Sequence, residues 1–361
     1  MNIGVLTTSF PRHAGDYAGS FVGDRLQRLL DQGHQVEVLA AGVAGDLPSV
    51  TVDGRLTVRR VPASRALFYR EGAPEALERG GAIWLAAAQF STALAAAARQ
   101  RRGSWDAIES HWLVPSALAA SAAAPTHPRR AFAHSGDVAL LERIPFGRTI
   151  ARRLARDGTD LRFVSADLQT RFARLCWAPA NIGSIASIGM VETLDVPPAL
   201  FSPRKAPEAA LRRRLGVAGP TVLAVGRLVP IKGHAALLHG CARARTWSTA
   251  AGRAEVVILG DGPERARLTR LAAALEVPLR LLGTVPRAEV ADWMRAADLF
   301  AHPSRPLANG RTEGAPIAAR EAQAIGIPVV VTNEVAALAR AIGAMSAQGG
   351  QPACNGSVSS V

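Results

Sequence analysis

Short apolar stretches alternate along the chain with longer segments of helical periodicity. Ten stretches rich in Val, Ile, Leu and Ala are predicted as strands: 3–8, 35–40, 106–110, 130–134, 161–165, 221–226, 255–260, 279–283, 299–304 and 327–332. Continuous apolar strands separated by helices are typical of parallel sheets that are covered on both faces. The pattern therefore predicts an α/β protein built from doubly wound, Rossmann-like sheets.

The alternation breaks once, in a stretch of five prolines and a charged helix at 195–220. Such a break is typical of an interdomain linker. For a chain of 361 residues, two domains are expected, at 1–196 and 197–344. The polar, Gly/Ser-rich residues 345–361 carry no periodicity and are expected to form a disordered tail.

Nothing in the sequence predicts a membrane span or a secreted protein. The long uncharged run 80–98 is alanine-rich and carries Gln, Ser and Thr, so it is predicted as a buried amphipathic helix. The amino terminus lacks the basic segment and long apolar core of a signal peptide. Three widely spaced cysteines form no disulfide or metal pattern, which favours a reducing cytoplasm.

The net charge of +13 does not by itself indicate nucleic-acid binding. Only Lys205 and Lys232 are lysines among the 42 basic residues, a bias that suggests GC-rich coding. Zinc-finger spacing, RNA-binding signatures and basic stripes with interleaved aromatics are all missing from the sequence. The basic excess in the second half could serve a membrane surface or a phosphorylated small molecule.

The loop after strand 221–226 is the first candidate site. Gly226 and Arg227 leave the strand, and Lys232 stands just before a helix that opens near Gly233. Two cations beside a helix N-terminus make a seat for a diphosphate. From this segment alone, a pair of solvated loop cations is an equal alternative.

The loop after strand 255–260 contains Gly260 and Gly262, which predict a tight strand-to-helix turn with exposed amides. Arg265 stands where the third glycine of the dinucleotide fingerprint G-x-G-x-x-G would be. A hydride-transferring Rossmann enzyme is therefore disfavoured.

Two carboxylates, Glu313 and Glu321, flank the start of a predicted helix before strand 327–332. Pro316 suits the first helical position, and Gly314 gives the chain freedom to approach a ligand. A carboxylate accepts two hydrogen bonds side by side and so suits the vicinal hydroxyls of a sugar. Charge compensation at a helix N-terminus and a solvated helix face are the alternatives for Glu313 and Glu321, respectively.

Three of these segments, "VGRLVPIKG", "LGDGPERARL" and "RTEGAPIAAREAQAIGIPVVVT", resemble the carboxyl half of GT-B-fold retaining glycosyltransferases of family 4. Upstream, "TTSFP", "GSFVGDRLQRLLDQGHQVEVLA", "ESHWLVPSALAA" and "AHSGDVALL" are similar to the amino half. The resemblance covers about residues 1–332. It implies two Rossmann-like domains facing across a cleft, with the donor nucleotide in the second and the acceptor in the first.

The resemblance also implies a donor site in the second half. Arg227 and Lys232 would grip the diphosphate of a nucleotide sugar, Glu321 the ribose, and Glu313 the hexose, with Arg227, Lys232 and Glu313 as catalytic candidates. The remaining donor-binding positions would be Gly226, Gly260, Gly262, Gly314, Ala315, Pro316 and Ile317.

In the first half, the resemblance places His134 against the reacting sugar as a further catalytic candidate. A lone histidine at a strand end is, however, often only a structural hydrogen-bonder. The implied acceptor-binding positions are Gly15, Gly19, His111 and Asp137.

The implied activity is transfer of a hexosyl group from a nucleotide sugar to a saccharide or lipid-linked saccharide, with retention of configuration. The setting would be exopolysaccharide or envelope glycan synthesis in the cytoplasm, with peripheral contact to the inner membrane face left open. No cofactor or metal is expected, because side-chain cations would stabilise the leaving group. A non-catalytic sugar-nucleotide binder and a nucleotide-sugar epimerase on the same fold are the alternatives.

After Thr332 the sequence departs from the family pattern. One helix, about 334–343, is predicted there, and the residues that follow are too polar for a buried strand. The second domain is therefore expected to be incomplete, with five strands and an exposed sheet edge. Truncation or frameshift is the favoured explanation, and a chain that works with a minimal second domain is the alternative.

Overall fold

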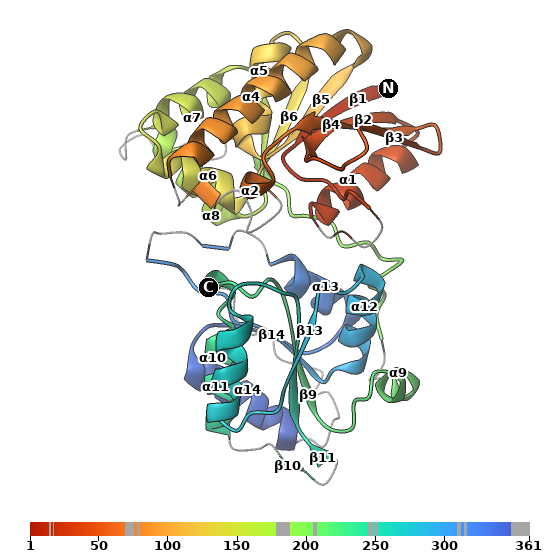
Figure 1. Cartoon of the computed structure of the whole chain (residues 1–361), viewed down its shortest axis with the longest axis vertical. Coiled ribbons are helices and arrows are strands. Elements are labelled where there is room, and N and C mark those ends of the chain that lie inside the picture. The colour runs from red at the N-terminus through yellow and green to blue at the C-terminus, as the bar shows by residue number, and fades with distance from the viewer. Residues whose placement is uncertain are drawn as a thin grey trace. The chain divides into compact units, whose positions relative to one another are not determined.

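A computed structural model gives the fold of the chain (Figure 1). It describes all residues except 14–15, 17, 69–75, 78–79, 178–187, 205–207, 245–247, 250–251, 309–311, 314–315 and 348–361. Contacts between Cα atoms divide the chain into two compact units, Met1–Asp195 and Val196–Val361.

The first unit is built on one eight-stranded sheet in the order β3-β4-β2-β1-β5-β6-β7-β8. All neighbours pair in parallel except the edge pair β3 and β4. The strands are β1 Asn2–Thr7, β2 Gln35–Gly42, β3 Ser49–Val52, β4 Leu56–Pro62, β5 Ala107–His111, β6 Arg129–Ala133, β7 Asp160–Phe163 and β8 Met190–Val191.

Helices cover both faces of this sheet because neighbouring strand residues point to opposite sides. Val5 packs in a core cluster with Leu26 of α1, whereas Leu6 packs in another with Phe90 and Leu94 of α4. The helices are α1 Ser20–Asp31, α2 Arg65–Phe68, α4 Ala82–Arg101, α5 Leu118–Ala123, α6 Ser135–Arg143, α7 Gly147–Arg156 and α8 Ala166–Cys176, with short non-α turns at Arg102–Ser104 and Leu113–Ala117.

The second unit repeats the plan on a five-stranded parallel sheet in the order β13-β12-β9-β14-β15. Its strands are β9 Thr221–Val225, β12 Glu255–Leu259, β13 Leu279–Gly283, β14 Leu299–His302 and β15 Val329–Val331. A separate antiparallel pair, β10 Ser248–Thr249 and β11 Gly252–Arg253, precedes β12.

Two helical layers enclose this second sheet. One core cluster joins the sheet to α10, α11 and α14, and the other joins it to α12 and α13, as the two sides of the sheet in Figure 1 show. The helices are α9 Ala209–Arg214, α10 His234–Ala244, α11 Arg265–Ala274, α12 Arg287–Ala296, α13 Ile317–Ile325 and α14 Val335–Ala347, with a 3₁₀ turn at Pro230–Lys232.

The structure confirms the α/β class, both doubly wound sheets, and all ten predicted strands. The strands that the sequence missed are β3, β4, β8, β10 and β11. Of these, β3 has every residue exposed, so it lacks the apolar stretch on which the prediction relied. The predicted helix at 80–98 is α4, which buries Phe90, Leu94 and Ala98.

Two helix boundaries and the proline-rich stretch differ from the prediction. Pro316 is the residue before α13 rather than its first residue. The last helix runs to Ala347, so residues 345–347 are not part of a disordered tail, and 348–361 lie outside the described residues. The proline-rich stretch is not a bare linker, because it holds α9 and contributes the buried Phe201 to the core of the second unit. The predicted truncation stays a prediction.

Candidate functional site

The loops that leave β9, β12 and β14 pack directly on one another at the carboxyl edge of the second sheet. The amide of Leu228 donates to the carbonyl of Asp261 at 2.9 Å, and the amide of Arg305 donates to the carbonyl of Ile231 at 2.9 Å. These loops come from strands that are neighbours in the sheet but far apart in sequence. The carboxyl edge is where open α/β sheets bind ligands.

Glycines make this close packing sterically feasible. Gly260 has φ 139°, and a Cβ at this position would lie 2.1 Å from the carbonyl oxygen of Gly226. Gly233 has φ 66°, and its Cβ would lie 1.9 Å from the carbonyl oxygen of Pro303. Gly262 likewise faces the backbone of Leu228. The predicted glycine turn therefore exists, and its glycines are required by backbone contact between loops.

Glu313 lies at the centre of a polar cluster on this edge, here called the β9–β14 cluster: Lys232, His302, Ser304 and Glu313. Its carboxylate forms an ion pair with Lys232, accepts from the Ser304 hydroxyl, and lies 2.9 Å from Nε2 of His302. Burial alone would raise the pKa of Glu313, but Lys232 and then His302 outweigh it and hold the pKa well below its usual value. The carboxylate is thus ionised at neutral pH.

Two of the four residues expected to converge, Lys232 and Glu313, are in direct contact. Arg227 lies in the same loop as Lys232, and its carbonyl is 3.3 Å from Nε2 of His234. Burial lowers the pKa of His234 to about 4, so this ring is neutral and structural.

Glu321 is held by a different cation. It is nearly buried in α13 and forms an ion pair with Arg287, the first residue of α12, with Nε–Oε1 at 3.1 Å. The solvated-face alternative for Glu321 is therefore wrong. Ile317 begins this helix and Pro316 precedes it, while Gly314 and Ala315 lie outside the described residues.

In the first unit, His111 and His134 lie together at the carboxyl ends of β5 and β6. Nδ1 of His111 is 3.4 Å from Nε2 of His134, and their rings are nearly parallel, at 22°. Phe21 and Trp112 also contact the His134 ring, with centroids at 4.9 and 5.0 Å. His134 is buried, and burial followed by the neighbouring His111 lowers its pKa well below the usual value.

Asp137 is turned into the protein. Its carboxylate accepts from the backbone amides of Leu113 at 2.7 Å, Val138 at 2.8 Å and His134 at 3.2 Å. Burial raises its pKa to about 7, although these amides favour the ionised form. In this structure Asp137 shapes the loops around His134, and its predicted contact with an acceptor stays a prediction.

Gly19 precedes α1 with φ 72°, and a Cβ there would lie 2.2 Å from the carbonyl oxygen of Ser9. It therefore lets the loop after β1 fold tightly onto the helix start. Gly15, its predicted partner, lies outside the described residues.

Sequence reasoning missed His302, Ser304 and Arg287. The first two stand at the carboxyl end of a strand that had been located, in "AHPS", so their position at that edge was a usable signal. Arg287 had no such signal, because its pairing with Glu321 depends on how α12 packs against α13.

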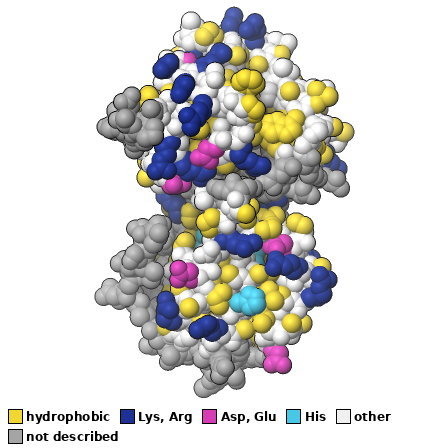
Figure 2. Space-filling model, turned by 90° about the vertical axis from the view of Figure 1, so that its left-hand side faces the viewer, with side chains coloured by type: hydrophobic (Ala, Val, Ile, Leu, Met, Phe, Trp, Pro, Cys, Tyr) yellow, Lys and Arg dark blue, Asp and Glu magenta, His cyan; other side chains and the backbone are white. Residues whose placement is uncertain are grey.

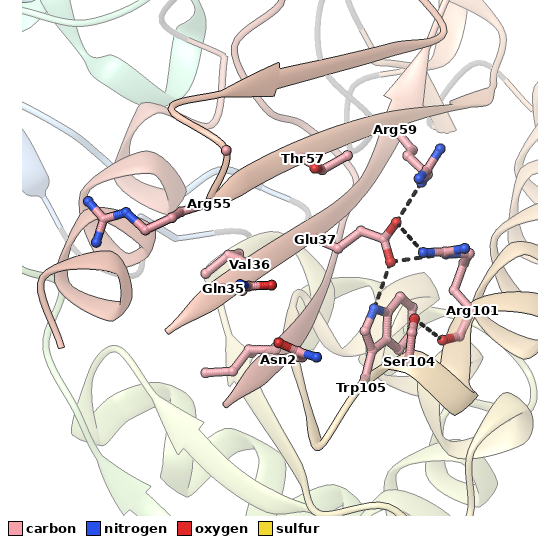
Figure 3. Close-up of a pocket in the computed structure, with 12 residues that line it drawn as sticks. Asn2, Gln35, Val36, Glu37, Arg55, Thr57, Arg59, Arg101, Ser104 and Trp105 are labelled. Atoms are coloured by element: carbon pink, nitrogen blue, oxygen red, sulfur yellow. Dashed lines mark hydrogen bonds and ion pairs between the residues drawn. The ribbon is translucent and has the colours of Figure 1, made fainter. Parts of the chain in front are cut away.

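A cavity of about 190 Å³ lies at the opposite edge of the first sheet, beside the amino ends of β1, β2 and β4. Figure 3 shows the Glu37 carboxylate between Arg59, Arg101 and the indole of Trp105. The amino edge is not where such sheets bind ligands, and the carboxylate's hydrogen bonds are already directed to these three side chains.

Two further findings concern the described residues alone. None of their helices is both long and apolar enough to cross a membrane. They also contain no group of three or more His, Cys, Asp or Glu side chains arranged to hold a metal ion.

Comparison with known proteins identifies relatives for both halves. Residues 219–349 match the family "Glycosyl transferases group 1". A GDP-mannose-dependent alpha-(1-6)-phosphatidylinositol monomannoside mannosyltransferase of Mycolicibacterium smegmatis is 32% identical over 239 residues, which are 62% of this chain and 58% of that enzyme. The chain thus spans less than two thirds of this relative. A D-inositol 3-phosphate glycosyltransferase of Thermobispora bispora is 28% identical over 88% of this chain and 74% of its own length.

Solved structures show the same fold. A sucrose-phosphate synthase of Thermosynechococcus elongatus superposes with a TM-score of 0.70 at 16% identity, over 96% of this chain and 90% of that one. Anabaena HepE, solved with UDP and glucose, has a TM-score of 0.63 at 18% identity, over 95% and 89% of the two chains.

Proposed function

We propose that the chain is a group 1, family 4 glycosyltransferase with the GT-B fold, and that it transfers a hexosyl group from a nucleotide sugar to a saccharide or lipid-linked saccharide. The β9–β14 cluster carries this proposal. It joins a cation and an ionised carboxylate at the edge of a parallel sheet where ligands bind.

In this proposal Lys232 and Arg227 hold the diphosphate of the donor. Only Gly233 separates Lys232 from the first residue of α10. The backbone amides at the N-terminus of that helix therefore add to the same diphosphate site. Negative charge grows on the departing phosphate during transfer, and a fixed cation stabilises that charge more than it stabilises the bound substrate.

Glu313 and Glu321 serve as acceptors for donor hydroxyls. Glu313 is held in place by His302 and Ser304, and Glu321 by Arg287, so neither carboxylate has to be ordered when the donor binds. The relatives' names support a nucleoside-diphosphate hexose as the donor class: one is GDP-mannose-dependent, and HepE was solved with UDP-glucose.

Transfer with retention needs no nucleophile from the protein in this proposal. The bond between the anomeric carbon and the phosphate oxygen breaks as the acceptor oxygen attacks from the same face. The departing phosphate oxygen takes the proton of the acceptor hydroxyl, so the products are a glycoside and a nucleoside diphosphate. His134 lies against the reacting sugar, and His111, Asp137 and Gly19 shape the acceptor side.

Contact with an anionic membrane surface is part of the proposal when the acceptor is lipid-linked. Figure 2 shows Lys and Arg side chains gathered on one face of the first unit, with hydrophobic side chains among them. At the start of α7, Phe146 is 74% exposed and is followed by the exposed Arg148, Arg152 and Arg153. Exposed aromatic and basic side chains together are typical of peripheral membrane contact.

The membrane contact is tested by cosedimentation with vesicles of phosphatidylcholine alone or with added phosphatidylglycerol. Binding that requires the anionic lipid and is lost in the double variant Phe146→Ser, Arg148→Ser is expected. Leu47→Ser is the matched control, because Leu47 is also largely exposed in the first unit. Equal sedimentation of all three proteins, or none at all, contradicts the contact.

The activity is tested in two steps on the full chain. A panel of UDP-, GDP- and ADP-hexoses is first screened by calorimetry, and the donor that binds is then incubated with and without saccharide acceptors. We expect an acceptor-dependent nucleoside diphosphate and a glycoside whose anomeric configuration, read by NMR, matches the donor. Binding without product supports a sugar-nucleotide binder, and an altered donor sugar without acceptor supports an epimerase.

A variant links the result to the site. Glu321→Ala is expected to weaken donor binding about tenfold, because it removes one charged hydrogen-bond acceptor. Glu276→Ala, which removes a carboxylate at the end of α11, is the control for net charge. Unchanged donor affinity in Glu321→Ala removes that residue from the site.

A further inference from the structure

A second buried carboxylate, Glu109, lies beneath the His111–His134 pair. It is in the middle of β5, two residues before His111, so both side chains point to the same face of the sheet. Arg25 of α1 binds it through two nitrogens, with Nε–Oε1 at 3.0 Å and Nη2–Oε2 at 2.9 Å. Burial would raise the pKa of Glu109, but His111 and Arg25 lower it to about 2. Glu109 is therefore an ionised acceptor.

Oε1 of Glu109 also lies 3.5 Å from Nε2 of His111. That nitrogen is buried and forms no hydrogen bond within the described part of the chain, so the Glu109 carboxylate is the acceptor that a proton on it would face. A carboxylate only accepts, so the proton of a neutral His111 ring belongs on Nε2. Nδ1 of His111 is then left with a lone pair.

The same donor–acceptor rule also fixes the tautomer of the second ring, His134. Nδ1 of His111 faces Nε2 of His134 at 3.4 Å. Two neutral imidazoles can bond only when one donates and the other accepts. Because Nδ1 of His111 accepts, Nε2 of His134 must carry the proton.

The contact on the other side of the His134 ring is consistent with a proton on Nε2. A capping box at the start of α6 links the side chain of His134 with the backbone amide of Asp137. A backbone amide donates, and a His134 ring with its proton on Nε2 has its other nitrogen, Nδ1, available to accept. Glu109 at one end and the α6 amide at the other thus favour the same tautomer of His134.

We propose that Glu109, fixed by Arg25, is a positioning residue that sets the Nε2–H tautomer of His111 and, through it, the Nε2–H tautomer and ring orientation of His134. The inference rests on the proposed function only in assigning a use to this proton. His134 then offers its Nε2 proton to a sugar hydroxyl oxygen, shared with His111, and takes no proton at that nitrogen during the reaction.

A purely structural role for Glu109 has a different outcome. If the carboxylate only ties α1 to the sheet through Arg25, its loss destabilises the unit without changing either tautomer. The tautomers are therefore the decisive measurement, and they can be read without any activity.

The test uses the full chain with ¹⁵N-labelled histidine, whose eight rings are resolved in long-range ¹H–¹⁵N correlation spectra. The variants His111→Gln and His134→Gln assign the two signals. In the wild-type protein at pH 7 we expect both rings to be neutral and protonated on Nε2. Either ring protonated on Nδ1, or charged, overturns the proposal.

The variant Glu109→Gln tests directly whether the tautomers depend on the Glu109 carboxylate. Arg25 donates only, so it holds the glutamine oxygen, and the glutamine NH₂ group turns to His111 and donates to Nε2. We expect His111 to change to the Nδ1–H tautomer and His134 to lose its Nε2 proton or its contact with His111. An unchanged pair of tautomers in a folded Glu109→Gln protein refutes the proposal.

Glu37→Gln is the matched control. Glu37 is also a carboxylate paired with arginines in the first unit (Figure 3), but it lies near the amino end of β2, whereas both rings lie at the carboxyl ends of β5 and β6. Its variant is expected to keep both tautomers. Where transfer is measurable, Glu109→Gln is expected to lower kcat about tenfold with little change in the donor KM, and Glu37→Gln to leave both alone. A wild-type chain without transfer activity contradicts the proposed function and leaves the tautomer result standing.

Discussion

The two units share one architecture but fill the same edge of their sheets with opposite chemistry. In the second unit, the loops after β9 and β14 bring together Lys232 and Glu313, an ion pair that is partly exposed. In the first unit, the corresponding edge carries His111 and His134, two buried rings packed against aromatic side chains. The carboxylate near the rings, Glu109, lies below them and is matched by Arg25. The scaffold thus fixes where a site lies, and the loop residues decide which part of a substrate it suits.

That contrast has a physical reason. A diphosphate carries charge that grows when the bond to the sugar breaks, so it calls for fixed cations. A hexose or saccharide is neutral and presents hydroxyls and apolar ring faces, so it suits polar groups of fixed direction and aromatic side chains. The chemistry of each edge matches the part of the reaction that the proposed function assigns to it.

The largest effect on turnover is expected from removing the cations at the carboxyl edge of the second sheet. Lys232→Ala should lower kcat about 10²- to 10³-fold, the cost of losing one donor that acts on developing charge. Donor affinity, measured by calorimetry, should fall far less, and Arg227→Ala should show the same imbalance. Arg243→Ala, at the exposed end of α10, controls for net charge. Equal losses of turnover and affinity would place Lys232 in ground-state binding alone.

The second test concerns how closely the loops approach. Gly260→Ala should lower the unfolding free energy by about 2–4 kcal/mol, because its Cβ would lie 2.1 Å from a carbonyl oxygen. Gly23→Ala in α1 should raise it by about 0.5–1 kcal/mol, since no heavy atom lies within 4 Å of the added Cβ. Urea unfolding measures both. A neutral Gly260→Ala would mean that the loops can separate at little cost.

Ionic strength should change the KM of the donor but not the KM of the acceptor, and this effect should be smaller than those of the substitutions above. Raising ionic strength from about 0.05 to 0.5 M shortens the screening length and should raise the donor KM about two- to fivefold. The KM of a neutral saccharide acceptor should stay the same, because no exposed charge is expected to hold it. Initial rates with one substrate saturating measure each constant, and a parallel rise in both would remove the distinction.

The smallest expected effect is a pH dependence of stability from His234. Burial lowers its pKa from 6.5 to about 4, so between these values the unfolded chain binds a proton that the folded chain does not. The contribution of His234 to stability should fall as pH drops through this window, by at most about 1.4 kcal/mol per pH unit. His234→Asn should flatten the slope in urea unfolding between pH 7 and 4, and an unchanged slope would contradict the assignment.

The sequence predicted elements better than partners. Strands such as β9 and β12 were found because an apolar run of this kind is a local signal, and β3 was missed because its residues are exposed. Glu313 was recognised as a site residue, but its contacts with His302 and Ser304 were not, although all three lie within twelve residues of one another. The hydrogen-bonding of Asp137 to three amides was likewise outside the reach of pattern reasoning.

By itself the sequence determined the alternation of strands and helices, the two sheets and the loops that bear the chemistry, because each follows from the periodicity of neighbouring residues. Only the tertiary structure decided which charges meet. Lys232 reaches Glu313 across 81 residues, Arg25 reaches Glu109 across 84, and Glu321 is paired with Arg287 of another helix. Those pairings depend on strand order and helix packing, which bring distant segments within a few ångströms and leave no trace in local periodicity.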